Sequence, residues 1–132
     1  MTKKWVISSD LESARRVEEE LLHLVEGNGY GPAAAFAIKL ALEEGLNNAV
    51  RHGNGGDARK SVEVVSCCDA ARFEITITDQ GHGFDPSAVP DPTADENLEK
   101  PSGRGIMLMR AYMDEVRFSP QGNQVHMVKK NQ

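Results

Sequence analysis

Cysteine is scarce in this chain of 132 residues, and its only two cysteines, Cys67 and Cys68, are adjacent. Neighbouring cysteines are poorly placed for a mutual disulfide, and this spacing matches no common metal-binding pattern. We therefore interpret them as two small strand residues, one on each face of a sheet, in a protein of a reducing compartment.

Long apolar runs and an excess of basic charge are also missing. No stretch approaches the roughly 20 residues of a membrane-spanning helix. The first residues, MTKKWVISSD, become polar too early for the apolar region of a signal peptide. The 15 Lys and Arg residues are outnumbered by 20 Asp and Glu, which gives a formal net charge of −5. We expect a cytoplasmic protein that binds neither membranes nor, directly, nucleic acid.

The chain does carry clear secondary-structure signals, enough for one domain over residues 1–132. Helices are predicted over about 10–25, 32–52 and 105–113, the first with Glu18, Glu19 and Glu20 outside its apolar stripe. Strands are predicted over 4–8, 61–67 and 72–79, with a final hairpin over 115–130. This order predicts an α+β fold, in which a mixed sheet carries its helices on one face. Residues 80–105, rich in Gly, Pro and acids, would be a functional lid or a disordered insert.

The second predicted helix contains polar residues within an otherwise apolar sequence, LALEEGLNNAVRHG. Glu44, Asn48 and His52 are spaced i, i+4 and i+8, so they would share one helix face. A carboxylate and an amide one turn apart could form half of a Mg²⁺ site, and the carboxylate could deprotonate a nucleophile. The alternative is a solvated polar face at a helix end, and the helix alone does not decide between the two.

Two glycine-rich segments follow. DQGHGF leaves a strand at Asp79 and turns through Gly81 and Gly83, so an acceptor carboxylate lies beside backbone that can approach a flat ring or a sugar. SGRGIML opens directly into a helix, whose first amide groups and dipole would favour a phosphate. Each motif alone could be a simple turn, and neither fits the P-loop or the Rossmann fingerprint.

Taken together and in this order, the three elements resemble the N, G1 and G2 boxes of the Bergerat-fold, or GHKL, ATPases and kinases. The matching segments are Glu44 to Asn48, Asp79 to Gly83 and Gly103 to Gly105. The stretches GRGIMLMRAYMDEVRF and GNQVHMVKK resemble the stand-alone branch, the anti-sigma factors with serine/threonine protein kinase activity. The resemblance covers nearly the whole chain. It implies a histidine kinase-like ATPase domain with three helices on one face of a mostly antiparallel sheet, and an ATP lid at about 85–102.

The resemblance also implies roles for the matching residues, with ATP and Mg²⁺ as cofactors. Asn48 would coordinate Mg²⁺, Glu44 would act as general base toward a serine hydroxyl or water, and Asp79 would accept the adenine amino group. The other nucleotide-binding residues would be Gly81, Gly83, Gly103, Arg104, Gly105, Ile106 and Lys100. We interpret His52 as structural, and Asn47 as either a polar helper of the nucleotide or an exposed residue.

The implied function is that of an anti-sigma factor and serine kinase that sequesters a sigma factor and phosphorylates a STAS-domain antagonist. A homodimer is also implied, and Trp5 on the first strand would belong either to the core or to the dimer surface. Two alternatives stay open: an ATP-gated binding module without phosphoryl transfer, and a histidine-kinase-type catalytic domain acting in trans. Glu44 favours the kinase, whereas Pro101, where some members place an arginine, favours the gated module.

Overall fold

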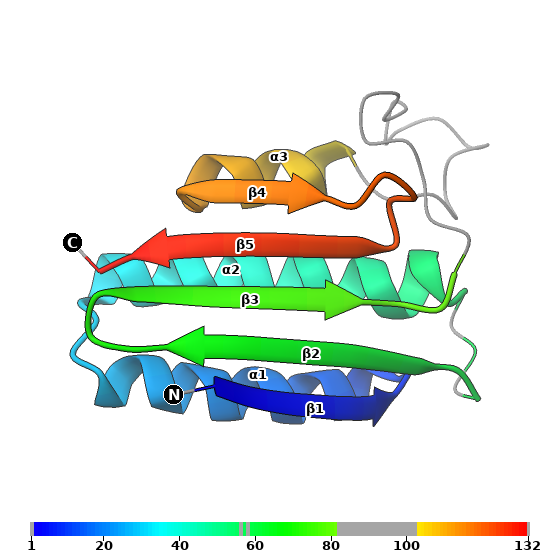
Figure 1. Cartoon of the computed structure of the whole chain (residues 1–132), viewed down its shortest axis with the longest axis horizontal. Helices are drawn as coiled ribbons and strands as arrows, with labels where there is room; N and C mark the ends of the chain where they lie inside the picture. The colour runs from blue at the N-terminus through cyan, green and yellow to red at the C-terminus, as the bar shows by residue number, and fades with distance from the viewer. Residues whose placement is uncertain (1, 56, 58, 82–102, 132) are drawn as a thin grey trace.

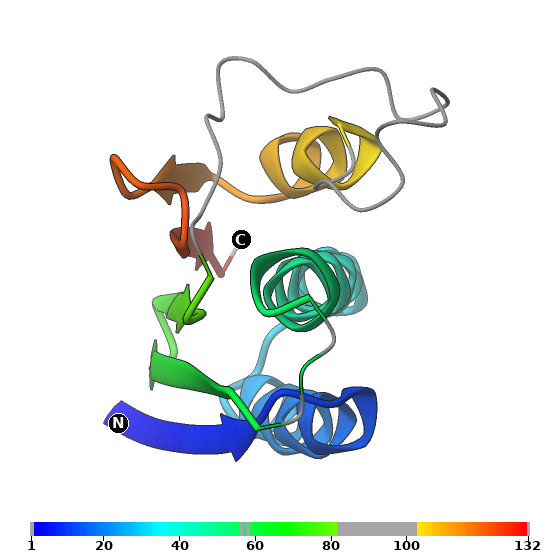
Figure 2. The ribbon, with the colours of Figure 1, turned by 90° about the vertical axis from the view of Figure 1, so that its right-hand side faces the viewer.

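The computed structural model describes residues 2–55, 57, 59–81 and 103–131. A five-stranded sheet has the strand order β1-β2-β3-β5-β4, and three α-helices cover one face of it (Figure 1, Figure 2). The strands are β1 Thr2–Ser8, β2 Ser61–Cys68, β3 Arg72–Thr78, β4 Glu115–Phe118 and β5 Gln124–Lys130. The helices are α1 Leu11–Gly27, α2 Pro32–Asn47 and α3 Gly103–Tyr112. The predicted α+β order is confirmed.

The four strand pairings of this sheet are all antiparallel, where a mixed sheet was expected. Short turns join β2 to β3 and β4 to β5, which makes both pairs antiparallel hairpins. Between β1 and β2 the chain crosses the sheet twice, once in α1 and once in α2, so β2 begins where β1 ends and Ser61 pairs with Ser8. A single crossover helix would have made this pair parallel.

The core lies between the sheet and the helices. Every second residue of β2 and β3 is buried, as expected for strands with one covered face. On α1 the buried residues are spaced three and four apart, at Ala14, Val17, Leu21 and Val25. Cys67 and Cys68 lie on opposite faces of β2 as predicted, with Cys68 on the buried side. No helix in the described ranges is long and apolar enough to cross a membrane.

The second predicted helix is not regular to its end, which corrects the expectation of one α-helix to residue 52. The α-helical part stops at Asn47, and Asn48–Gly53 continue as a π-helix. The Asn54 N–H closes this turn by donating to the carbonyl of Ala49, five residues earlier, at 2.9 Å. A π turn contains more residues than the 3.6 of an α-helical turn. Positions 48 and 52 therefore no longer have the spacing of an α-helix, on which the prediction of a shared face depended. Such single turns are frequent at functional sites.

Three of these elements have their ends at the same side of the molecule. Figure 1 shows the C-terminal end of α2, the end of β3 and the first turn of α3 on the right, and Figure 2 looks at that side directly. These ends carry the segments that were predicted to form the N, G1 and G2 boxes. The fold therefore brings together motifs that are far apart in the sequence.

Candidate nucleotide site

Helix α2 places Glu44 and Asn48 at the border of the core, where both side chains are half-buried. Gly45 lies against the sheet, because a methyl group at this position would be 2.9 Å from Ile77 Cδ1 and 3.3 Å from Met127 Cε. The glycine thus lets α2 approach β3 and β5 closely. The turn that carries Glu44 and Asn48 is thereby held next to the central strands.

The Asn48 side chain carries a polar atom without a partner in the part of the chain that the structure describes. Its nitrogen, Nδ2, is buried and has no hydrogen-bond partner among the described residues. Such a group costs about 1–3 kcal/mol, so it calls for a functional or structural reason. The last torsion of asparagine is broad and nearly two-fold, so the amide oxygen and nitrogen can exchange places. The amide nitrogen is a hydrogen-bond donor and does not bind a cation, so an ion at this site would use the amide oxygen, a ligand that Mg²⁺ takes.

The described residues offer no cluster of three or more His, Cys, Asp or Glu side chains for a metal ion. Mg²⁺ keeps several waters and relies on substrate phosphates rather than on a full protein cage. A magnesium ion at this site would therefore use Asn48 and the nucleotide together.

Glu43 and Asn47, which directly precede Glu44 and Asn48 in the sequence, face α1. Glu43 and Asn47 line a cleft of about 280 Å³ between α1 and α2. Successive helix residues are about 100° apart, so each of the pairs Glu43–Glu44 and Asn47–Asn48 is divided between two faces. Asn47 is half-buried and faces α1, so it is not the exposed residue that one of the two interpretations expected.

Asp79 directly follows β3 and is half-buried. Its Oδ1 accepts the Gly81 N–H at 2.7 Å, and its own N–H donates to the Asn123 carbonyl at 2.9 Å. Burial raises the pKa of the Asp79 carboxyl above its ordinary value, although the Gly81 amide and the charge of Lys60 act in the opposite direction. A carboxylate that has lost part of its hydration gains more from a new donor, such as an exocyclic amine, than an exposed one does.

The first turn of α3 is the third part of the predicted site. The helix begins at Gly103, and Gly105 is buried. The Ile106 side chain is 3% exposed and packs in the core, so its contribution to a phosphate site would come from the backbone. Other predicted features lie outside the described residues: Gly83, Lys100, the side chains of Arg104 and His52, and the lid at about 85–102.

Trp5 agrees in part with the first of its two interpretations, that of a core residue. It is half-buried and packs against the core cluster. Its Nε1 donates to Glu20 Oε2 on α1 at 3.0 Å. Trp5 therefore joins the edge strand β1 to α1 within the chain.

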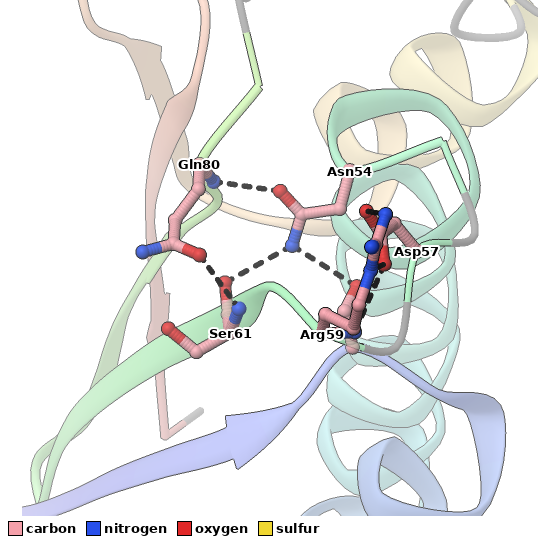
Figure 3. A network of polar contacts seen from close by, with 6 residues as sticks. Asn54, Asp57, Arg59, Ser61 and Gln80 are labelled. Atoms are coloured by element: carbon pink, nitrogen blue, oxygen red, sulfur yellow. Dashed lines mark hydrogen bonds and ion pairs between the residues drawn. The ribbon is translucent and has the colours of Figure 1, made fainter.

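Asn54 was not among the predicted site residues, and it lies two residues after the end of the predicted second helix. The side chain of Asn54 is 2% exposed and forms hydrogen bonds to Ser9, Ser61 and Gln80 (Figure 3). An asparagine directly after a helix is also a common C-terminal residue, so the sequence offers no local signal for these long-range contacts.

Known proteins resemble this chain in sequence and in fold. The sequence pattern of the histidine kinase-like ATPase domain matches residues 7–129. Anti-sigma F factors of Bacillus thuringiensis and Bacillus mycoides are each 33% identical over 98 residues, which cover 70% of this chain and 66% of theirs. This chain thus spans slightly less than two thirds of the length of these relatives.

A crystal structure of the RsbU and RsbW domains of a Mycobacterium tuberculosis protein shares the fold. The TM-score is 0.67 at 16% identity, and the match covers 100% of this chain and 32% of that one. The match to the domain family includes β2, β3 and all three predicted boxes. The chain therefore belongs to the histidine kinase-like ATPase domain family.

Proposed function

We propose that this chain is an anti-sigma factor with protein-serine kinase activity. It binds Mg·ATP, sequesters a sigma factor and phosphorylates a serine of a STAS-domain antagonist. Membership of the family and similarity to proteins named anti-sigma F factor support the proposal. The observation that carries it is the half-buried pair of Glu44 and Asn48, one helical turn apart at the end of α2, on the same side of the molecule as the end of β3 and the first turn of α3 (Figure 1).

In this proposal each part of the site has a separate task. Bound Mg²⁺ supplies charge neutralisation at the phosphates, and Asn48 holds it through the amide oxygen. Asp79 orients the nucleotide by accepting a hydrogen bond from the adenine amino group. The first turn of α3, from Gly103 to Gly105, receives the phosphates with its backbone amides and helix dipole.

Glu44 takes part in the transfer itself. Its carboxylate accepts the proton of the serine hydroxyl while the serine oxygen forms a bond to the γ-phosphorus. The bond between that phosphorus and the oxygen of the β-phosphate breaks, so ADP leaves and phosphoserine remains. The proposed partners are accordingly a sigma factor, the antagonist and a second copy of this chain, all in the cytoplasm.

A transfer assay with γ-labelled Mg·ATP and purified STAS-domain proteins tests this role of Glu44. Glu44→Gln should lower the transfer rate by about 10²-fold or more, the usual contribution of a general base. Its ATP affinity should stay within about threefold of the wild type, because binding is not the step that uses the base. Glu43→Gln is the matched control, since Glu43 faces α1 and its replacement should leave transfer unchanged.

One result would count against the role of Glu44, and another against the kinase itself. Undiminished transfer by Glu44→Gln would remove Glu44 as the base. Tight Mg·ATP binding by the wild type without transfer to any STAS-domain protein would favour the second candidate, a nucleotide-gated binding module. Pro101, where some members place an arginine, is the observation that favours this candidate.

A further inference from the structure

We propose that Asn54 is a positioning residue for adenine recognition, which acts by holding the peptide group between Asp79 and Gln80. The inference rests on the proposed function, because it concerns how the same nucleotide site is assembled. Asn54 is 2% exposed, and an asparagine is rarely buried so completely unless its hydrogen bonds are made. It lies outside the three boxes, so none of their roles explains it.

Both ends of the Asn54 amide are used. Oδ1 accepts the N–H of Gln80 at 2.7 Å, and Nδ2 donates to Ser9 Oγ and to the Ser61 carbonyl, each at 3.0 Å. Gln80 also reaches β2, because its Oε1 accepts the N–H of Ser61 at 2.8 Å. Figure 3 shows the closed triangle of Asn54, Ser61 and Gln80. Since donor and acceptor are both engaged, the orientation of the amide is fixed.

This triangle acts on Asp79 through the backbone. The Gln80 N–H belongs to the peptide group that follows Asp79. The Asp79 N–H, in the peptide group before Asp79, donates to the Asn123 carbonyl at 2.9 Å. With a hydrogen bond on each side, the backbone of Asp79 is held at the point where β3 ends. The rotamer of a side chain depends on its backbone torsions, so Asn54 limits where the Asp79 carboxylate can point.

The same residue also ends the helix that carries Asn48. Its N–H donates to the Ala49 carbonyl at 2.9 Å and closes the π-helix Asn48–Gly53. Asn54 therefore connects the end of α2, the start of β2 and the end of β3. A recognition site needs its groups placed to within about 0.5 Å. Here one buried residue connects the segment that carries Asn48 to the segment that carries Asp79, and so sets the distance between the metal-binding and the adenine-binding residue.

Titration with two nucleotides tests this inference. ATP is compared with purine riboside triphosphate, which lacks the 6-amino group, both with Mg²⁺, on the full chain. The wild type should prefer ATP by roughly tenfold or more, the value of one hydrogen bond to a carboxylate. Asn54→Ala should lose roughly five- to twentyfold in ATP affinity and bind the purine nucleotide about as well as the wild type does. Asp79→Asn gives the reference for complete loss of the preference.

Asn28→Ala serves as the matched control. Asn28 is half-buried and, like Asn54, forms side-chain hydrogen bonds, to the Leu24 carbonyl and Cys68 Sγ. It lies near the end of β2, whereas Asn54 lies near its start. Its loss should destabilise the fold and leave the ratio of the two affinities unchanged. A purely structural effect of Asn54→Ala would lower both affinities in proportion, and that result would overturn the inference.

The outcomes separate this inference from the proposed function. If the wild type binds no Mg·ATP, both fall. If the wild type binds and prefers ATP but Asn54→Ala keeps the same preference, only the positioning role falls. Should Asn54→Ala fail to fold, hydrogen exchange of the wild type decides: the Gln80 amide should exchange at least about 100-fold more slowly than an open-loop amide. Exchange at the open-loop rate would mean that the hydrogen bond from the Gln80 N–H to Asn54 Oδ1 is not maintained, and would refute the positioning role.

Discussion

Replacing Glu18 by glutamine should stabilise the protein at alkaline pH and leave it unchanged at acid pH. Glu18 lies in the cleft between α1 and α2, and its Oε1 is buried without a partner among the described residues. Burial, followed by the charge of Glu43, raises the pKa of Glu18 from 4.5 to about 7, against the smaller opposite effects of Lys39 and Arg15. The ionised form is therefore the one that the fold disfavours.

The size of the effect follows from this rise in the pKa. A rise from 4.5 to about 7 corresponds to about 3 kcal/mol at 1.36 kcal/mol per unit. The cleft is open to solvent, which screens the charges, so we expect about 1–2 kcal/mol. Because the folded-state pKa is the higher one, wild-type stability should fall as the pH rises from 4.5 to 7 and stay at the lower value above that.

Urea unfolding at several pH values between 4 and 8 measures this difference. The free energies of unfolding of Glu18→Gln and wild type should coincide near pH 4 and differ by about 1–2 kcal/mol at pH 8, with the variant more stable. Glu26→Gln, at an exposed position near the end of the same helix, is the control and should show no comparable pH-dependent gain. A variant that is less stable than the wild type at pH 8 would mean that ionised Glu18 is stabilised in the fold, and would refute the reasoning.

Two further predictions concern the packing of α2 and the carboxylate of Asp79. Gly45→Leu should lower the free energy of unfolding by about 2–3 kcal/mol, because even a methyl group at this position would lie 2.9 Å from Ile77 Cδ1. A thermal or urea melt measures this loss. A melt equal to that of the wild type would contradict the close approach of α2 to the sheet. The affinity for Mg·ATP should fall on acidification at a pH above the ordinary pKa of an aspartate, because burial raises the pKa of Asp79 and the protonated carboxyl is the poorer acceptor. Calorimetry over a pH series tests this, with Asp79→Asn as the variant whose affinity should be weak and independent of pH in that range.

Local periodicity predicted much of the fold. The alternation in β2 and β3 reflects a sheet with one covered face, and the spacing of buried residues in α1 reflects a helix on that face. These signals are local, so they can be recognised in the sequence without knowing which elements pack together. The antiparallel pairing of β1 with β2 was missed because it depends on two successive helical crossings rather than on any residue of the strands.

Three features, two of them at the candidate site, were not predicted from the sequence, each for a physical reason. The π-helix after Asn47 depends on one hydrogen bond, from Asn54 N–H to the Ala49 carbonyl, and has no distinct sequence pattern. Glu18 was expected outside the apolar stripe, yet its carboxylate is partly buried because α2 packs beside it. The contact between Asn54 and Gln80 joins residues far apart in the sequence, so only the tertiary fold brings it about.

Titration of ATP by calorimetry, with and without Mg²⁺, tests the proposed nucleotide site most directly. Wild type and Asn47→Ala should both bind ATP in a Mg²⁺-dependent manner, because Asn47 faces the cleft toward α1. Asn48→Ala should lose this Mg²⁺-dependent affinity by about tenfold or more while unfolding at the same urea concentration or higher, since it removes an unsatisfied buried amide. If Asn48→Ala instead binds Mg·ATP as tightly as the wild type, Asn48 is not the magnesium ligand and the site proposed here is wrong.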